Sequence, residues 1–106
     1  MIKAQFYTAQ DGHLLGFEIT GHSGYAQEGF DIICASVSSA AYMTANTILE
    51  ILKVSAFTDV ADGRMVVRIP FKSADVCRDI LAGFKLHMVS LEEQYPKFIT
   101  VNYLEV

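Results

Sequence analysis

The residues best suited to chemistry in this chain are a histidine and a cysteine, His22 and Cys34. Glycines permit backbone angles closed to other residues, so the stretch from Gly21 to Gly29 is predicted to be a loop of special shape. Asp31 is a good helix N-cap and is followed by helix-compatible residues. Cys34 is therefore predicted at the third helical position.

A cysteine at that position can act as a nucleophile. The free N–H groups and the positive dipole end of the first helical turn favour a thiolate there. His22 ends a predicted strand, and the loop can fold it back onto Cys34. A histidine beside a helix-start cysteine is the minimal apparatus of a thiol nucleophile with its base.

Each of these residues also has a structural interpretation. Free cysteine is among the most buried residue types, so position alone favours Cys34 as a packing residue, and the glycine loop with His22 shifts the balance toward function. The loss of Asp31 as a cap would cost about 0.5–2 kcal/mol. Whether Asp31 also orients His22 stays open. Ser38 lies one turn after Cys34 on the same face, as a packing residue that can hydrogen-bond near the thiol.

The hydrophobic pattern gives the first elements that must position these side chains. Residues 2–8 and 15–20 alternate between apolar and polar around the turn signal Asp11-Gly12, which predicts a β-hairpin. Residues 32–53 predict a helix that is apolar on nearly every side. Such a helix is expected to be buried all round.

The second half of the chain repeats this arrangement. Residues 56–60 and 64–69 predict another hairpin, and residues 97–106 predict a final strand. Between them, Ser73 is the expected cap of a second helix that Pro96 stops. The inner stripe of that helix is predicted to be Val76, Ile80, Phe84, Met88, Leu91 and Tyr95. The order β-β-α-β-β-α-β indicates one α+β domain over residues 1–106, with a mostly antiparallel sheet packed with two helices.

Composition narrows the class of protein. The 106 residues carry a net charge of −4 with no basic cluster, which argues against a direct nucleic-acid partner. Apolar residues make up 52% of the chain, an excess that favours self-association. The uncharged run from Ile33 to Leu49 contains several Ser, Thr and Asn residues and is short for a bilayer, so we expect no membrane span.

The N-terminal residues show no secretory signal, which favours a reducing, cytoplasmic location with thiols at Cys34 and Cys77. A disulfide between the two cysteines stays open at this point. Cys77 is interpreted as structural, His13 as a solvated turn residue and His87 as a packed or rim residue.

Two other sites are rejected from spacing. A zinc site that includes His22 and Cys34 has no supporting ligand pattern, so no metal or other cofactor is expected. The segment Gly21-His22-Ser23-Gly24 has the form of the G-x-x-G loop of an RNA-binding KH module. That loop needs flanking helices and basic neighbours, whereas this one follows a strand and leads toward acidic residues.

The segment Gly21-His22-Ser23-Gly24-Tyr25-Ala26, followed by Gly29-Phe30-Asp31-Ile32-Ile33-Cys34-Ala35-Ser36-Val37-Ser38, resembles the signature of the bacterial ribosomal-processing cysteine proteases (Prp). The resemblance extends to the strand order, the Asp62-Gly63 hairpin and the whole length. Ser23 and Ser36 stand where the family more often has alanine. Both differences exchange one small residue for another.

The resemblance implies a homodimeric, cytoplasmic bacterial enzyme. Such enzymes remove a short N-terminal extension from large-ribosomal-subunit protein number twenty-seven during ribosome assembly, cutting after a pair of phenylalanines. The family's cysteine, histidine and aspartate match Cys34, His22 and Asp31. The segment from Gly24 to Phe30 matches a mobile loop over the site that orders on substrate binding.

Within that segment we expect a substrate-binding loop made of Gly21, Gly24, Tyr25, Gly29 and Phe30. Two other classes of protein stay open. A non-catalytic dimeric binding module of ribosome assembly explains the apolar excess but gives Cys34 and His22 no purpose. A thiol redox protein needs a resolving cysteine, for which Cys77 is the candidate.

Overall fold

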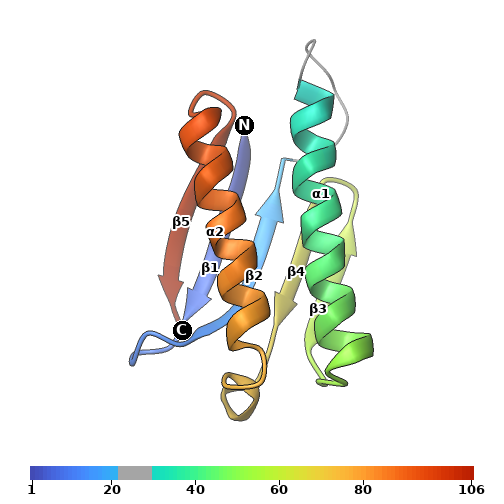
Figure 1. Ribbon diagram of the computed structural model, residues 1–106, viewed down its shortest axis with the longest axis vertical. Helices are drawn as coiled ribbons and strands as arrows, with labels where there is room; N and C mark the ends of the chain where they lie inside the picture. The colour runs from blue at the N-terminus through green and yellow to red at the C-terminus, as the bar shows by residue number, and fades with distance from the viewer. Residues whose placement is uncertain (22–29) are drawn as a thin grey trace.

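The alternating residues near the N-terminus form the first hairpin of a sheet. The computed structural model describes residues 1–21 and 30–106, with the backbone alone for Phe30 and Asp31 (Figure 1). β1 (Ile2–Thr8) and β2 (Leu14–Thr20) pair antiparallel. The alternate residues Ile2, Ala4 and Phe6 are buried, because one face of the pair carries the core and the other does not.

The described strands form one five-stranded sheet in the order β3-β4-β2-β1-β5. β4 (Arg64–Arg68) pairs antiparallel with β2 and with β3 (Phe57–Ala61), whereas β5 (Ile99–Glu105) runs parallel to β1. Both helices lie on one face of this sheet (Figure 1). The prediction of an α+β fold with a mostly antiparallel sheet is confirmed.

The first helix, α1 (Phe30–Asn46), continues into a π-helical turn, η1 (Thr47–Ile51). The Leu52 N–H donates to the Thr47 carbonyl at 2.8 Å, and the Val54 N–H donates to the Ile48 carbonyl at 3.0 Å. Lys53, with a φ of 55°, turns the chain out of the helix. The helical run therefore covers residues 30–51, close to the predicted 32–53.

The prediction that this helix is buried on all sides is wrong. Val37, Ala41 and Ile48 pack into the core, but Ile32 is 71% exposed and Met43 is 60% exposed. The reason is the layer arrangement, because helices cover one face of the sheet and nothing described covers the helices. The outer side of α1 is therefore apolar and open to solvent.

The second helix, α2 (Arg78–Gln94), begins later than predicted. Pro70 starts a 3-10 turn, η2 (Phe71–Ser73), and the Cys77 N–H donates to the Ser73 carbonyl at 3.2 Å, so Ser73 lies inside a helical turn and is not the cap. Within the predicted inner stripe, Val76 and Tyr95 are exposed. The buried stripe of α2 consists of Leu81, Phe84, Met88 and Leu91.

The core lies between the helices and the sheet. The Phe84 ring of α2 lies 5.7 Å from that of Phe6 and 4.7 Å from that of Phe17, measured between ring centroids. These tilted contacts between aromatic rings fix α2 over β1 and β2. In Figure 1, α1 occupies the other half of the same face, over β4 and β3.

One helical run, Ile32–Ile51, has the length and apolar composition of a membrane-spanning helix. Its inner face packs against the sheet, and 39% of its apolar window is buried inside the protein. Core helices of globular proteins pass the same test, so the run is weak evidence for a span.

Candidate active site

Cys34 lies near the start of α1, on the side of the helix that faces the sheet. Its side chain is 5% exposed and belongs to the core cluster together with Ile33 and Val37. Cys34 and Cys77 are both thiols, so the disulfide between them is not formed. The candidate nucleophile therefore combines a helix-start position with a buried environment.

The helix begins at Phe30, earlier than expected, and this changes the position of two predicted site residues. Asp31 is the second helical residue and not the N-cap. Cys34 becomes the fifth residue instead of the third.

This shift matters for the chemistry. The first four N–H groups of an α-helix have no acceptor within the helix, and the fifth N–H donates to the first carbonyl. The N–H groups of the first helical turn precede Cys34 by about one turn. The favourable field of the helix dipole is strongest in that same turn.

Gly21 fixes the point at which the chain leaves β2, immediately before His22. Its φ is 81°, and its N–H donates to the Gly63 carbonyl at 2.9 Å. A side chain at this position would collide with the carbonyl oxygen of Met1. A glycine at this position therefore lets the end of β2 lie close to both the β3–β4 turn and the N-terminal residue.

Ser38 follows Cys34 by one turn and is half-buried. Residues four apart on a helix lie one above the other, so Cys34, Ser38 and Tyr42 form a single row along α1. Tyr42 is 48% exposed. The row thus passes from the core at Cys34 to the surface at Tyr42.

Several predicted site residues lie outside the described part of the chain. These are His22, Gly24, Tyr25 and Gly29. Phe30 and Asp31 are described as helical backbone alone. The pairing of Cys34 with His22 and the substrate-binding loop therefore stay predictions.

The other candidate residues have mixed outcomes. Cys77 is fully buried between η2 and α2, and burial raises the pKa of its thiol, which fits a structural role. His87 is exposed and lines a groove between α1 and α2. His13 keeps 35% of its side chain exposed, so it is partly solvated as expected, but it is not an isolated turn residue.

His13 instead joins two segments far apart in sequence. Its Nδ1 lies 2.8 Å from the Asp11 carboxylate, its Nε2 lies 3.3 Å from the Asp75 carboxylate, and its ring packs edge-on against Phe71. The hydrogen bond to Asp11 is the largest cause that raises the pKa of His13. The pKa of Asp11 is lowered, first by the hydrogen bond from the His13 backbone N–H and then by the hydrogen bond to the His13 side chain.

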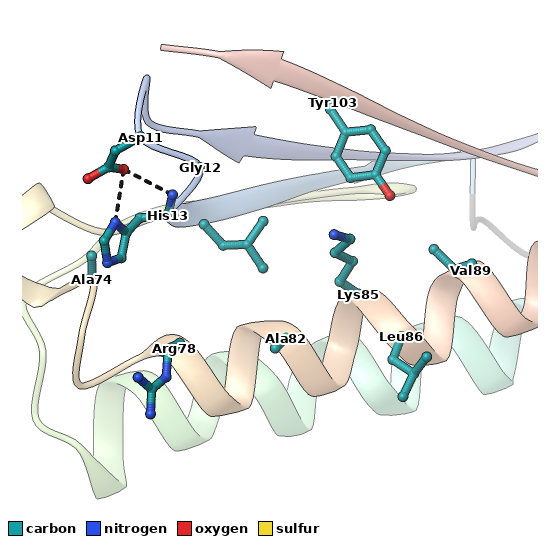
Figure 2. A pocket seen from close by; sticks show the side chains of 11 residues that line it. Asp11, Gly12, His13, Ala74, Arg78, Ala82, Lys85, Leu86, Val89 and Tyr103 are labelled. Carbon is teal, nitrogen blue, oxygen red and sulfur yellow. Dashed lines mark hydrogen bonds and ion pairs between the residues drawn. The ribbon is translucent and has the colours of Figure 1, made fainter.

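A cavity of about 690 Å³ lies beside His13 and runs along α2 from Arg78 to Val89 (Figure 2). Arg78, Lys85 and Leu86 of α2 line it on one side and Tyr103 of β5 on the other. Cys34 does not line this cavity. Lys85 lies over the Tyr103 ring at 5.2 Å, and His13 is paired with Asp11, so two of its cationic groups already have partners.

Among residues 1–21 and 30–106, no three histidine, cysteine or acidic side chains gather closely enough to hold a metal ion. The described chemistry of the site therefore consists of one thiol and the amide groups of a helix start. This small two-layer α+β architecture, with a cysteine in the first turns of α1, has the features of a thiol-dependent enzyme.

The comparison with known families makes this assignment specific. The model of the family described as cysteine protease Prp matches residues 1–100, so the chain belongs to the cysteine protease Prp family. The ribosomal processing cysteine protease Prp of Staphylococcus aureus strain Mu50 is 24% identical over 105 residues, covering 97% of this chain and 99% of that protein. The Bacillus subtilis protein of the same name is 29% identical over 62 residues. That match spans 58% of this chain and about half (55%) of the length of the Bacillus subtilis relative.

Solved structures share the fold along the full chain. A crystal structure of the Staphylococcus aureus protease Prp in complex with a substrate peptide has a TM-score of 0.88 at 23% identity, covering 98% of this chain and all of that one. The Streptococcus mutans protein SMU.848 has a TM-score of 0.82 at 31% identity, covering 100% of this chain and 99% of that one. The expected family is thereby confirmed.

Proposed function

We propose that this protein is a cysteine endopeptidase that removes the short N-terminal extension of large-ribosomal-subunit protein number twenty-seven during ribosome assembly. Membership of the cysteine protease Prp family is the observation that carries the proposal. Relatives from Staphylococcus aureus and Bacillus subtilis are named ribosomal processing proteases. Structures of the Staphylococcus aureus relative contain a substrate peptide in one case and a covalently linked product peptide in another.

In the proposed mechanism the Cys34 thiolate attacks the scissile carbonyl carbon. His22 takes the thiol proton and then delivers it to the departing amine as the peptide C–N bond breaks, which leaves a thioester. Water, deprotonated by His22, attacks the thioester carbonyl carbon. The C–S bond breaks, the product leaves as a carboxylic acid, and the Cys34 thiolate regains the proton from His22. Backbone N–H groups of the first turn of α1 are the proposed donors to the oxyanion.

The test uses purified protein and a peptide that copies the extended N-terminus of the ribosomal protein. Mass spectrometry follows the cleavage by the wild-type protein beside Cys34→Ala and His22→Ala. A cut after the paired phenylalanines that is lost in Cys34→Ala and strongly reduced in His22→Ala is the expected result. Full cleavage by Cys34→Ala would overturn the mechanism.

The non-catalytic binding module is the second candidate, because a cysteine that is 5% exposed is also what a packing residue looks like. The rate of alkylation separates the two functions. An activated Cys34 reacts quickly even below neutral pH, whereas a packing thiol reacts slowly. An intact peptide together with a slow-reacting Cys34 would favour the binding module.

We also infer that the protein works as a cytoplasmic homodimer. The support is the apolar outer side of α1, where Ile32, Met43 and Ile51 are all exposed. Large exposed apolar surface commonly marks an interface. Sedimentation analysis should give a mass twice that of the 11.7 kDa chain, and a monomer at all concentrations would contradict the inference.

A further inference from the structure

The cavity of Figure 2 lies between α2 and the turn that joins β1 to β2. On the α2 side its wall is one stripe of the helix, because the lining residues recur at spacings of three and four: Arg78, Ala82, Lys85, Leu86 and Val89. The helical rise from Arg78 to Val89 is about 16 Å. The opposite wall consists of the hairpin turn, with Leu14, and of Tyr103 in β5.

The size and lining of this cavity are those of a small-molecule binding site. Its volume of about 690 Å³ falls within the range of about 300–1,000 Å³ that is typical of ligand pockets. Most of its wall is apolar, and Leu14, Ala82 and Val89 are among the lining residues. Ligand sites combine such an apolar lining with a few polar groups that orient the ligand.

Lys85 supplies the central polar group of this cavity. Its Nζ atom lies 5.2 Å from the centre of the Tyr103 ring, and Figure 2 shows the ammonium and the Tyr103 hydroxyl in the space between α2 and β5. Among residues 1–21 and 30–106, no carboxylate forms an ion pair with Lys85. A contact with an aromatic ring is weaker than a hydrogen bond between two charged groups. The ammonium is therefore available to an anion, and the Tyr103 hydroxyl can donate a second hydrogen bond to it.

The acidic groups around the cavity are held by other partners. The Asp11 Oδ1 atom lies 2.8 Å from His13 Nδ1 and accepts a hydrogen bond from the His13 backbone N–H at 3.1 Å. Asp75 lies 3.3 Å from the second nitrogen of the same ring, and Asp79 lies 3.3 Å from Arg78. Each of these carboxylates thus faces a cationic group or an N–H group that is not the central ammonium.

The groove between α1 and α2 is of another kind. It has a volume of about 540 Å³ and is lined by Met43, Phe84 and His87, with no lysine or arginine among the described residues that line it. The ammonium of Lys85 therefore distinguishes the cavity of Figure 2 from this groove. It also defines the charge of the ligand that the cavity fits.

We propose that the cavity of Figure 2 is a second binding site, separate from Cys34, for a small amphipathic anion. A carboxylate or phosphate group of the ligand binds the Lys85 ammonium and the Tyr103 hydroxyl. The apolar body of the ligand lies along Leu14 and Ala82. Because Cys34 does not line the cavity, this site is independent of the proposed function, and its ligand is bound without being cleaved.

Two fluorescent probes that differ by one sulfonate test the proposal. Anilinonaphthalene sulfonate carries an anion on an aromatic body, and phenylnaphthylamine is the same body without the anion. The sulfonate probe should bind the wild-type protein about three- to tenfold more tightly than the uncharged probe, as measured by fluorescence titration. Equal affinities of the two probes would overturn the proposal.

Substitution of Lys85 completes the comparison. Lys85→Met removes the ammonium and keeps an unbranched side chain, so the Kd of the sulfonate probe should rise about three- to tenfold while that of the uncharged probe changes less than about twofold. Lys72→Met is the matched control, because Lys72 is exposed and does not line the cavity. An equal rise in Lys72→Met would reveal a general effect of net charge and would overturn the proposal.

Amide chemical shifts locate the bound probe without any substitution. In the wild-type protein the sulfonate probe should shift the amides of Leu14, Ala82 and Tyr103 most. The exposed apolar side chains of Met43 and Ile51, on the outer side of the first helical run, are the competing place for an apolar probe. Shifts confined to that side would overturn the proposal. This measurement decides the matter if Lys85→Met does not fold.

None of these measurements depends on peptide cleavage. Absence of cleavage by the wild-type protein would overturn the proposed function and leave the second site standing. Absence of probe binding, or binding without the contrast between the two probes, would overturn the second site and leave the proposed function standing.

Discussion

The two outer edges of the sheet, β3 and β5, are finished differently. At β5, α2 supplies the Glu92 carboxylate to the Val101 N–H, and the helix end supplies the Tyr95 carbonyl to the Ile99 N–H. At β3, all five residues are exposed and Thr58 and Val60 point their main-chain groups outward. Open edges favour unwanted pairing, and proteins commonly cover them or keep them short.

The difference shows which edge the fold protects. β5 has seven residues and is partly sealed by side chain and helix, whereas β3 has five and stays open on the side of α1. A short strand limits the risk of aggregation at an open edge. The edge at β3 is thus the one left open.

The largest expected effect is on the cleavage rate, from substitution of the candidate nucleophile Cys34. Cys34→Ala should lower kcat by about 10³-fold or more, because the nucleophile is lost. Peptide binding should survive, as measured by calorimetric titration with the uncleaved peptide. Cys34→Ser is the matched control for volume. Loss of binding together with loss of cleavage would show that Cys34 maintains the fold of the site.

The next effect concerns the seal of β5. Glu92→Ala leaves the Val101 N–H without its acceptor and should reduce the free energy of unfolding by about 1–3 kcal/mol in urea denaturation. The neighbouring exposed residue provides the control, since Glu93→Ala should change stability little. Equal effects of the two substitutions would remove the contrast between the edges.

A smaller effect of opposite sign is expected in the helix that covers the β5 side. A Cβ added at Gly83 meets no atom within 4 Å. Gly83→Ala should therefore stabilise the protein by about 0.4–1 kcal/mol, by restricting the unfolded chain. The rate of peptide cleavage should stay at the wild-type value. A lowered rate would place the α1–α2 groove in substrate binding.

The smallest effect is a pH dependence near the start of α2. Asp11, followed by Asp75, raises the pKa of His13 above its ordinary value of about 6.5, so protonated His13 stabilises the folded state. This contribution is fully present below pH 6.5 and is lost as the pH rises through the raised pKa. His13→Asn should make the urea midpoint less dependent on pH over that range, as measured by urea denaturation between pH 5.5 and 8.

Much of the fold follows from local pattern. Alternation in residues 2–8 and 15–20 and the Asp11-Gly12 turn predict the first hairpin, because period-two burial and turn chemistry are both local. The helix boundaries are less local. Phe30 and Asp31 extend α1 toward the N-terminus, and the turn after Pro70 absorbs Ser73.

The candidate site could be predicted in part. Cys34 was identified from its position after Asp31 and its neighbours, and the family that it implied is confirmed. The open edge of β3 could not be predicted, because it depends on which strand ends the sheet. The His13–Asp75 contact joins residues 62 positions apart, and nothing in either local sequence indicates it.

The parallel pairing of β1 with β5 has a consequence for how the chain reaches this structure. β1 is synthesised well before β5, and Ile2 pairs with Ile99, so one edge of β1 waits unpaired until β5 has been synthesised. Pairings so distant in sequence form slowly and expose strand edges meanwhile. A nascent chain that stalls before β5 emerges would present seven residues of β1, with an apolar inner face, to whatever lies near the exit tunnel.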